Sequence, residues 1–281
     1  IMNKTIILLL LSICLGVFSV SAEKKVMTVK SNYHTLYASA GAKVVYNPES
    51  SKGTVIEING PADKINWVDV TVANNTLYIR PKAENGNRIG NRLKGVTITV
   101  NGPLVRNLRV SSSGKISSTT WLEFRKSTLS LSASSSGEIK LANVSAPTVI
   151  IKSSSSGDIE LSSVNSASVQ LSSSSSGDVE IKEVLGKSLS AKASSSGDIK
   201  ISSVACDNVS LSASSSADIK ITKMSAGNVS ASSSSSGDIV MSGKADHAAL
   251  SASSGGDVDA RNLNYSHSSI RSSSGGSVYE K

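Results

Sequence analysis

The chain is poor in the residues on which disulfide-bonded domains and most enzymes depend. Its 281 residues include only two cysteines, two tryptophans, two phenylalanines and three histidines. So few aromatic rings exclude a core built around them, and the single cysteine beyond residue 22 excludes an internal disulfide in that part of the chain. No HExxH, CxxC, GxSxG, Walker or GxGxxG pattern occurs, so the sequence predicts no catalytic residues, no cofactor and no metal ligands.

Acidic residues are scarce in one part of the chain only. Residues 23–110 carry 13 Lys or Arg against 6 Asp or Glu, whereas residues 111–281 carry 15 of each kind. The sequence therefore predicts a basic N-terminal part joined to a body of zero net charge. A localised positive field attracts anionic partners. For an exported protein we expect these to be polysaccharides or lipid head groups, and not nucleic acid.

The N-terminus has the parts of a secretory signal peptide. A short positive segment, Met2-Asn3-Lys4, precedes an apolar run over residues 6–20, and small residues follow as far as Ala22. We predict a signal peptide over residues 1–22 and an exported protein, in the periplasm, on the outer cell surface or outside the cell. Two alternatives stay open. One is a membrane anchor, which the short run disfavours, and the other is a lipoprotein cut before Cys14, although Ile13 stands where a small residue is needed.

The body is a serine-rich repeat of about 20 residues. Residues 111–281 contain 55 serines, and a serine block ends repeatedly in Gly, usually followed by an acid. After a first step of 23 residues, the steps between these glycine positions are 20, 20, 20, 20, 20, 19 and 20. A fixed period of this length is typical of a solenoid. The positions are Gly114, Gly137, Gly157, Gly177, Gly197, Gly237, Gly256 and Gly276, with Ala217 in the remaining place.

Apolar and polar residues alternate within each repeat, as in the segment over residues 157–161. A 20-residue unit cannot bury its own apolar side, but stacked units can, when each strand pairs in parallel with the equivalent strand of the next coil. We therefore predict an all-β fold, a parallel solenoid over residues 111–281 with about eight coils of two or three strands each. The expected inward rows are Ile139, Ile159, Val179, Ile199, Ile219, Ile239 and Val258; Leu141, Leu161, Ile181, Ile201, Ile221 and Met241; and Val149, Val169, Leu189, Val209 and Val229.

Strand parity also assigns a side to each serine of the block. One row is predicted to point inward, where its hydroxyls need partners in the neighbouring coil: Ser135, Ser155, Ser175, Ser195, Ser215, Ser235 and Ser254. Two rows are predicted to point outward on a flat sheet, as a candidate lattice of hydroxyls for a glycan chain or another solenoid. They are Ser134, Ser154, Ser174, Ser194, Ser214, Ser234 and Ser253, and Ser136, Ser156, Ser176, Ser196, Ser216 and Ser236.

Two further positions of the repeat indicate tight packing. Ala217 replaces the repeated glycine once, so close packing at a corner, more than a positive φ, explains that glycine. Cys206 stands where other repeats have Ala146, Ser166 and Gly186, which favours a small buried residue over a reactive thiol.

Residues 23–110 are predicted to form a β-rich head that caps the first coil. Alternating segments lie at residues 26–29, 42–46, 54–58, 68–72, 74–79 and 96–100, with a hairpin expected at Asn74-Asn75 and a core around Trp67 and Tyr78. A Gly- and Asn-rich loop over residues 80–94 carries five basic residues and one acid. It is a candidate contact for an anionic glycan or lipid, and the alternative is a solvated hairpin tip. The basic residues are Arg80, Lys82, Arg88, Arg92 and Lys94.

The whole pattern resembles a known family. Units such as Ser156-Gly157-Asp158-Ile159 follow a signal peptide and a β-rich lead-in that ends at residues 108–116. This is similar to the family described as "putative auto-transporter adhesin, head GIN domain", which occurs in Bacteroidetes-type bacteria. The resemblance covers nearly all of the chain beyond residue 22. It implies a right-handed parallel β-helix, an exported location and an adhesin function, and it supplies no catalytic residues.

From these observations we expect a non-enzymatic β-solenoid for adhesion or cell-surface interaction, with a cell-surface glycan or another envelope protein as its partner and no transmembrane helix beyond the signal peptide. The alternatives are a structural spacer of the cell envelope without a specific ligand, and a polysaccharide-acting enzyme, for which the coils offer almost no inserted loops.

An outward acidic row can bind cations, or it can be offset by Lys140, Lys200 and Lys220 and cap backbone amides. The row consists of Glu138, Asp158, Asp178, Asp198, Asp218, Asp238 and Asp257.

Overall fold

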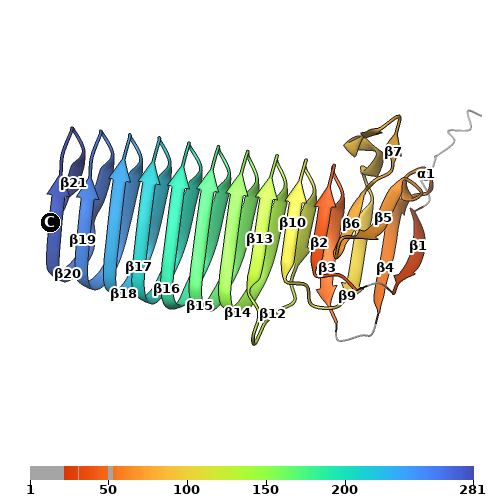
Figure 1. Cartoon of the computed structure of the whole chain (residues 1–281), viewed down its shortest axis with the longest axis horizontal. Helices are drawn as coiled ribbons and strands as arrows, with labels where there is room; N and C mark the ends of the chain where they lie inside the picture. The colour runs from red at the N-terminus through yellow and green to blue at the C-terminus, as the bar shows by residue number, and fades with distance from the viewer. Residues whose placement is uncertain (1–21, 31, 50–52) are drawn as a thin grey trace, which may run out of the picture.

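The computed structural model describes residues 22–30, 32–49 and 53–281 and forms a β-solenoid of about nine turns. Successive coils lie side by side along one axis (Figure 1). The predicted all-β parallel β-helix with a period of about 20 residues is confirmed. Apart from Ala22, the expected signal peptide lies outside the described residues, and so does the alternative cleavage site at Cys14.

Each full coil is one long bent strand that pairs in parallel with the next. Residues pair with their equivalents in the adjacent coil, for example Ile159 with Val179 and Val179 with Ile199. Because the register hardly shifts, side chains of one kind form rows along the axis. The coils are β14 (Glu138–Ser154), β15 (Asp158–Ser174), β16 (Asp178–Ser194), β17 (Asp198–Ser214), β18 (Asp218–Ser234), β19 (Asp238–Ala252) and β20 (Asp257–Ser272).

Two bends divide each coil into three faces. In β14 the pairing with β15 is interrupted at Ala142 and again at Pro147, and at each bend two successive residues avoid the interior. We call residues 138–141 face 1, residues 143–146 face 2 and residues 148–154 face 3, and use the same names for the equivalent residues of the other coils. The coil therefore has three straight segments, which resolves the choice between two and three.

The predicted inward rows are confirmed. Ile199 is fully buried, and so are its equivalents Ile139, Ile219, Ile239 and Val258, while the rows that begin at Leu141 and Val149 are equally inaccessible. Burial of one such aliphatic side chain stabilises a fold by about 1.5–3 kcal/mol. The solenoid core thus consists of stacked branched side chains, and it needs no aromatic ring.

A tight serine turn closes each coil, and it corrects one prediction. In the turn over residues 154–157, Ser155 and Ser156 have φ values of 51° and 60°, and the Gly157 amide donates to the Ser154 carbonyl over 2.9 Å. Two successive left-handed residues interrupt the strand alternation. The prediction that Ser155 and its equivalents point inward is therefore wrong, because they are exposed at the turn tip. These tips line up along the top edge of the stack in Figure 1.

The repeated glycine is required by close approach, as predicted. A Cβ at Gly157 would lie 2.5 Å from the carbonyl carbon of Ala133 in the preceding coil, and φ at Gly157 is not positive. Ala217 occupies the same place in its coil. Among the described turns of the coils from Gly114 onward, that turn alone lacks the hydrogen bond from the fourth residue back to the first.

A different row, two residues before the turn tip, carries the serines that do point inward. Each of their hydroxyls bonds to a carbonyl four residues further along the chain. Ser153 is 3% exposed, and its hydroxyl donates to the Gly157 carbonyl. Ser173 and Ser233 make the equivalent bonds to Gly177 and Gly237. Where the row carries Ala193 or another alanine, no hydroxyl needs a partner, which explains the exchange of Ser with Ala at this position.

The single 19-residue step has a local cause. The register between β18 and β19 shifts after Ile221, and Gly243 pairs with Met224. Gly243 has a φ of 129°, and a Cβ there would lie 2.2 Å from the Met224 carbonyl oxygen. Glycine thus lets the first bend turn with one residue fewer.

The N-terminal strands continue the same sheet. β2 (Thr35–Ser39) and β3 (Lys43–Pro48) form a further coil that pairs in parallel with β10 (Asn107–Ser111) and β11 (Lys115–Ser118). On the other side, β6 (Thr76–Pro81) extends face 3 and β9 (Thr97–Gly102) extends face 1. Strands from before and after residue 110 pair in one sheet. The division into a head and a solenoid at this residue stays a prediction.

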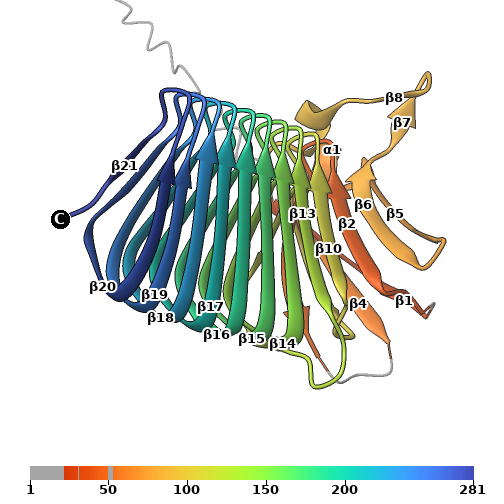
Figure 2. The same ribbon diagram turned by 60° about the vertical axis from the view of Figure 1, so that its left-hand side comes forward.

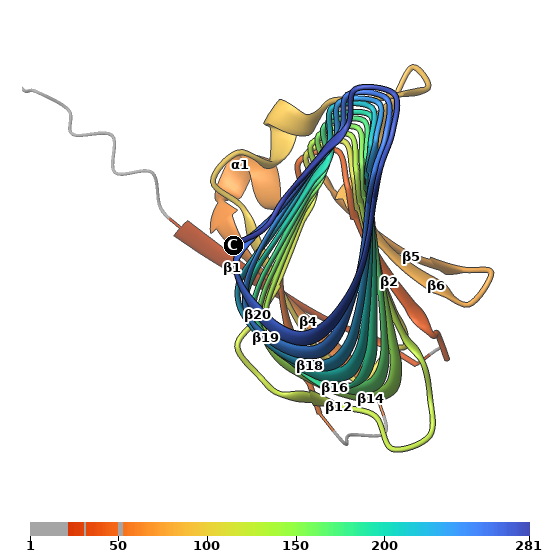
Figure 3. The same cartoon turned by 90° about the vertical axis from the view of Figure 1, so that its left-hand side faces the viewer.

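Beyond this coil the two extended faces separate and end in antiparallel strands. β5 (Val68–Ala73) pairs with β6 through a hairpin in which Asn74 and Asn75 both have positive φ, as predicted, and this hairpin projects to one side in Figure 3. The other face ends in β4 (Thr54–Pro61) and β1 (Ala22–Val29). The remaining elements are α1 (Ala62–Ile65), β7 (Ala83–Glu84), β8 (Asn87–Arg88), η1 (Gly90–Leu93), β12 (Leu122–Glu123), β13 (Leu129–Ser134) and β21 (Ser277–Tyr279).

The aromatic residues of the head are only partly placed as expected. Trp67 packs against the core, but Tyr78 lies on the outward side of β6, where its ring meets that of Tyr37 edge-on at 5.6 Å. The fully buried ring is that of Tyr46, whose hydroxyl donates to the Pro103 carbonyl over 2.7 Å. Burial raises the pKa of Tyr46 well above its ordinary value. The expected role of Tyr78 in the core is therefore wrong.

The inward rows generate a first prediction. Ile199→Ala removes a fully buried side chain from the middle of a row, and we expect it to lower the free energy of unfolding by about 2–5 kcal/mol. Lys200→Ala changes the neighbouring exposed side chain and should cost under about 0.5 kcal/mol. Chemical denaturation of both variants measures the difference, and equal losses would contradict the assigned parity.

The glycine row generates a second prediction. Gly197→Ala places a Cβ 2.5 Å from the Ser174 amide nitrogen, so we expect a loss of about 1–3 kcal/mol in unfolding free energy. The reverse change, Ala217→Gly, allows the missing turn hydrogen bond but adds chain entropy, and should stay within about 1 kcal/mol of the parent. A destabilisation by Ala217→Gly as large as that by Gly197→Ala would refute the close-packing account.

Candidate functional site

A long hollow in the surface lies along face 3. It has a volume of about 800 Å³ and runs from Ile150 in β14 to Ser269 in β20. Outward side chains of successive coils line it in three parallel rows. We call it the face-3 groove. Its size is within the range of ordinary ligand sites, and its length follows the solenoid axis.

The floor of the groove is polar in its central part and apolar near its ends. The middle row consists of Ile150, Gln170, Ser190, Ser210, Ser230, Ala249 and Ser269, which pair from coil to coil. The central coils offer hydroxyl and amide groups on short side chains. A floor of this kind suits a ligand that has both hydroxyl groups and apolar surface.

One wall of the groove is a ladder of amides and imidazoles. Asn228 donates to Asn208 through their side chains over 3.0 Å, and the rings of His247 and His267 stack with centroids 4.8 Å apart. All four side chains are exposed. Each retains polar atoms that can bind a ligand, and stacking fixes the orientation of the two imidazole rings.

The opposite wall carries positive charge. Lys152 and Lys192 are exposed, lie two coils apart in the same row, and are separated by Ser172. Within the described part of the chain, neither lysine forms an ion pair. Toward the N-terminus the same row continues through Ser132 to Arg109.

The zero net charge of the body conceals a separation of charge between faces. The outward positions of face 1 from β14 to β20 carry ten acidic and three basic side chains. The outward positions of face 3 from β10 to β20 carry four basic side chains and no acid. The overall neutrality of residues 111–281 therefore gives no guide to the field that a ligand meets at one face.

Carboxylates in the acidic row of face 1 accept hydrogen bonds from backbone amides. Of the two expected roles, cation binding and amide capping, this is the second. The Asp178 carboxylate accepts from the Asp198 amide over 3.3 Å, and the Asp198 carboxylate accepts from the Asp218 amide over 3.2 Å. Partial burial, and then the charges of Asp198 and Asp238, raise the pKa of Asp218 above its ordinary value. Among the described residues, no three His, Cys, Asp or Glu side chains are grouped as metal ligands.

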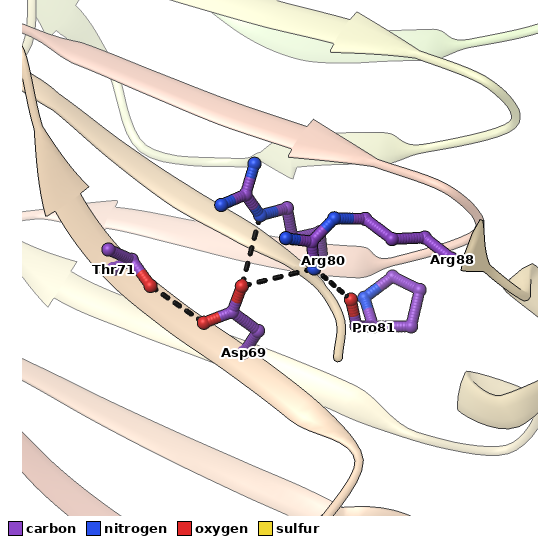
Figure 4. Close-up of polar contacts among 5 residues, drawn as sticks. All are labelled: Asp69, Thr71, Arg80, Pro81 and Arg88. Carbon is purple, nitrogen blue, oxygen red and sulfur yellow. Dashed lines mark hydrogen bonds and ion pairs between the residues drawn. The ribbon is translucent and has the colours of Figure 1, made fainter. Parts of the chain in front are cut away.

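The predicted basic loop forms the small β7–β8 hairpin, which stands away from the solenoid in Figure 2, followed by η1. Two of its arginines bind one carboxylate. Arg80 and Arg88 donate to Asp69 over 3.0 and 3.1 Å, and Thr71 donates to the same carboxylate over 2.6 Å (Figure 4). Burial raises the pKa of Asp69, but these hydrogen bonds and the two positive charges outweigh it and hold that pKa below its usual range. These two arginines therefore stabilise the head.

A third arginine of the loop is also engaged. Arg92 lies over the Trp67 ring at 3.8 Å and forms an ion pair with Glu84. Lys82 and Lys94 are exposed, and neither forms an ion pair within the described part of the chain. The structure thus divides the five predicted contact residues into three that brace the head and two whose charges face solvent.

A second hollow of about 600 Å³ lies between the loop and the serine turn at Ser112 and Ser113. Lys94 and Arg88 line it together with Lys43 and Lys115, beside the turn at Gly41. Lys115 also pairs with Glu138. The strand of Lys43 and the loop are brought together only in the folded chain.

The predicted serine face is placed at the end of each coil. Its members are the last residues before the turn, they are half-buried, and they pair in register with one another. The row that begins at Ser136 lies at the exposed turn tip with positive φ, so the two rows form a ridge and not a flat sheet. The half-buried members are Ser134, Ser154, Ser174, Ser194, Ser214 and Ser234.

Cys206 is placed as expected. It pairs with Gly186 on one side and Ala226 on the other, and it is 6% exposed. Burial, and then the charge of Asp207, raise the pKa of its thiol to about 11. The thiol is therefore protonated near neutral pH and poorly suited to nucleophilic chemistry.

The face-3 groove was missed at the sequence level. Alternation identifies outward residues, but it does not show that two bends separate them into faces with different charge. The available signal was the 20-residue alignment itself. Reading down the position of Lys152 gives only serines and basic residues from Arg109 to Arg271.

The chain is similar to known proteins in sequence and in fold. The model of one family, described as "Putative auto-transporter adhesin, head GIN domain", matches residues 32–205 and 192–279. A "putative adhesin" structure from Parabacteroides distasonis superposes with a TM-score of 0.63 and 14% identity, over 91% of this chain and 98% of that one. One from Parabacteroides merdae gives 0.58 and 14%, over 89% and 95%.

A third structure carries a different description. The "Putative lipid binding protein" of Parabacteroides distasonis has a TM-score of 0.56 and 16% identity, over 92% of this chain and 96% of that one. At these identities the likeness establishes the fold alone. Among curated proteins none matches the chain. Within the described residues, no helix has the length and apolar character needed to cross a membrane.

The basic loop generates a third prediction. Arg88→Ser breaks the contact with Asp69, and we expect a lower melting temperature at pH 7, whereas Lys94→Ser should leave it unchanged. Because the pKa of Asp69 is depressed in the folded state, the stability from this pair is present above the ordinary carboxylate pKa and lost as pH falls through the folded value. The difference between wild type and Arg88→Ser should therefore shrink below about pH 4. Thermal melts across pH measure it, and a difference that persists undiminished in acid would contradict the assignment.

Proposed function

Because this chain belongs to the family described as "Putative auto-transporter adhesin, head GIN domain", we propose that it is an exported, non-enzymatic surface-interaction protein that holds an extended glycan in the face-3 groove. The single observation that carries the proposal is the groove itself. It is a hollow of about 800 Å³ along the outer side of the coils from β14 to β20, and its lining combines hydroxyl, amide and imidazole groups with apolar surface.

The ladder of coils makes this channel rigid. On face 3, each coil from β14 to β19 is hydrogen-bonded to both neighbours through parallel pairing, so the rows of side chains keep a fixed spacing of about 4.8 Å. A rigid site loses little conformational entropy on binding. Repetition of the same short side chains also lets a repeating ligand make the same contact several times, and many weak contacts then add up.

The groove suits a glycan better than a compact small molecule. Its floor offers hydroxyls, one wall offers the amides of Asn208 and Asn228, and its lining extends over the coils from β14 to β20. The imidazoles of His247 and His267 add flat surfaces at the C-terminal end. A sugar chain presents both hydroxyl groups and apolar ring faces, and this combination is complementary to such a surface.

The other predicted contacts remain candidates beside it. The exposed charges of Lys82 and Lys94 support an anionic contact at the head, and the serine ridge presents a regular row of hydroxyl groups. A cell-envelope spacer without a specific ligand is the second function class, and its support is the straight rod-like stack in Figure 1. Binding measurements separate these possibilities.

A glycan array with the chain from residue 23 onward tests the proposal. Ser210→Trp fills the floor of the groove, and we expect it to abolish binding to the glycans recognised by the wild type. Ser202→Trp places the same bulk on an exposed bend outside the groove and should bind normally. Circular dichroism confirms that both variants keep the β fold.

Each contrary outcome has a definite meaning. If the wild type binds no glycan on the array, the glycan-binding proposal fails and the spacer function is favoured. If Ser210→Trp binds as well as wild type while Lys82→Ser combined with Lys94→Ser does not, the contact lies at the head and the groove is not the site.

A further inference from the structure

Three of the four cations on face 3 recur at every second coil, and the fourth, Arg271, follows Lys192 after three coils with serine in that place. Arg109, Lys152 and Lys192 occupy the same row of the sheet, and each is separated from the next by one coil that has serine in that place, Ser132 or Ser172. All three cations are exposed. With coils about 4.8 Å apart, positive charges follow one another along the axis at roughly 10 Å.

The row begins in an aromatic platform. Arg109 pairs with Tyr37 of β2 and lies over its ring at 5.5 Å, and Tyr37 pairs in turn with Tyr78 of β6. Arg80 lies over the Tyr78 ring at 4.7 Å. A strip of two tyrosine rings and the guanidinium group of Arg109 therefore extends the wall beyond the groove toward the N-terminal end, where Arg80 is already paired with Asp69.

From β10 to β20, no acidic side chain on face 3 neutralises the charges of Arg109, Lys152 and Lys192. No outward position of face 3 from β10 to β20 holds Asp or Glu, and the acidic row of the solenoid stands on face 1. The ion pairs among the described residues of the body, such as Lys140 with Glu160, use acids of face 1, and the Arg261–Asp259 pair lies at the bend where that face ends. The two lysines of the groove wall are thus available to a ligand.

We propose that the N-terminal end of the face-3 groove, with the row of cations that continues from it to Arg109, binds an acidic polysaccharide that carries one anionic group per disaccharide and lies along the solenoid axis. The proposal rests on the proposed function and specifies its ligand class. An extended pyranose chain advances by about one coil spacing per sugar, so a disaccharide matches two coils. A carboxylate or sulfate on every second sugar then meets Arg109, Lys152 and Lys192 in turn, while the intervening sugars face serines.

Three polysaccharide probes test the ligand class with the chain from residue 23 onward. Hyaluronan has one carboxylate per disaccharide, polygalacturonate has one on every sugar, and dextran is neutral. We expect titration calorimetry at low salt to give the tightest binding, per carboxylate, with hyaluronan and none with dextran. The affinity should fall as salt is added, because exposed charges are screened.

Paired variants test the position of the charges. Lys152→Ser combined with Lys192→Ser should weaken hyaluronan binding roughly 5- to 20-fold. Lys200→Ser combined with Lys220→Ser removes the same charge from face 1 and should change the affinity less than about twofold. An equal loss in the face-1 variant would show that only the net charge of the protein matters, and it would overturn the proposal.

A third variant tests the spacing while it keeps the charge constant. Ser172→Lys combined with Lys192→Ser moves one cation to the adjacent coil, so the two lysine positions of the wall become one coil apart. We expect this variant to lose most of its preference for hyaluronan over polygalacturonate. An unchanged preference would refute the periodic match.

Failure of this inference differs from failure of the proposed function. If dextran and hyaluronan bind equally, both are blocked by Ser210→Trp, and neither responds to the lysine changes, the groove binds glycans but not acidic ones. If no polysaccharide binds but vesicles with anionic lipids do, and this depends on Lys152 and Lys192, the face binds a membrane surface and both proposals are overturned.

Discussion

The parallel hydrogen bonding of each coil to the next, in a register that hardly moves over 20 residues, is the interaction on which the rest of this structure depends. It sets Ile159 on Val179 and Val179 on Ile199, and so builds a core without aromatic rings from stacked aliphatic side chains. It also requires the repeated glycine, because the backbone of the preceding coil lies where a Cβ of Gly157 would be. The serine turn follows from the same constraint, since two left-handed residues reverse the chain within the narrow edge that the stack allows.

Fixed register acts on the outside of the solenoid as it does on the inside. One outward position repeated through the coils becomes a row, and the row multiplies the property of its residue. On face 1 this places like charges beside one another. Partial burial, and then these neighbouring charges, raise the pKa of Asp158 and Asp218, and carboxylates of the row accept backbone amides of the next coil. On face 3 the same rule produces a serine floor, an Asn and His wall and a row of separated cations. Surface chemistry in this protein is therefore a property of rows and not of single residues.

The sequence was sufficient for the period, the inward rows and the solenoid, because alternation and a 20-residue step depend only on local spacing. It failed where the backbone leaves strand geometry. Ser155 was assigned inward because parity was carried through a turn that parity does not describe. Tyr78 was assigned to the core although its strand continues face 3, which is decided by the pairing of β6 with β2 about forty residues away in sequence. The loop sequence makes Arg80 and Arg88 candidate anion contacts, but their partner in the folded chain is Asp69 of the neighbouring strand β5, which the loop sequence does not reveal. The separation of charge between faces needs the two bends of each coil, which composition does not reveal.

The most direct test of this account is a crystal structure of the chain with a hexasaccharide of alternating uronic acid and amino sugar. The account predicts that the oligosaccharide lies along the axis of the stack on face 3, above the serine floor, with successive carboxylates beside the cations of Arg109, Lys152 and Lys192. The carboxylates would then stand two coils apart. An oligosaccharide that crosses the coils at an angle, or that is bound only at Lys82 and Lys94 of the head, would contradict the claim that the repeat register organises the binding surface.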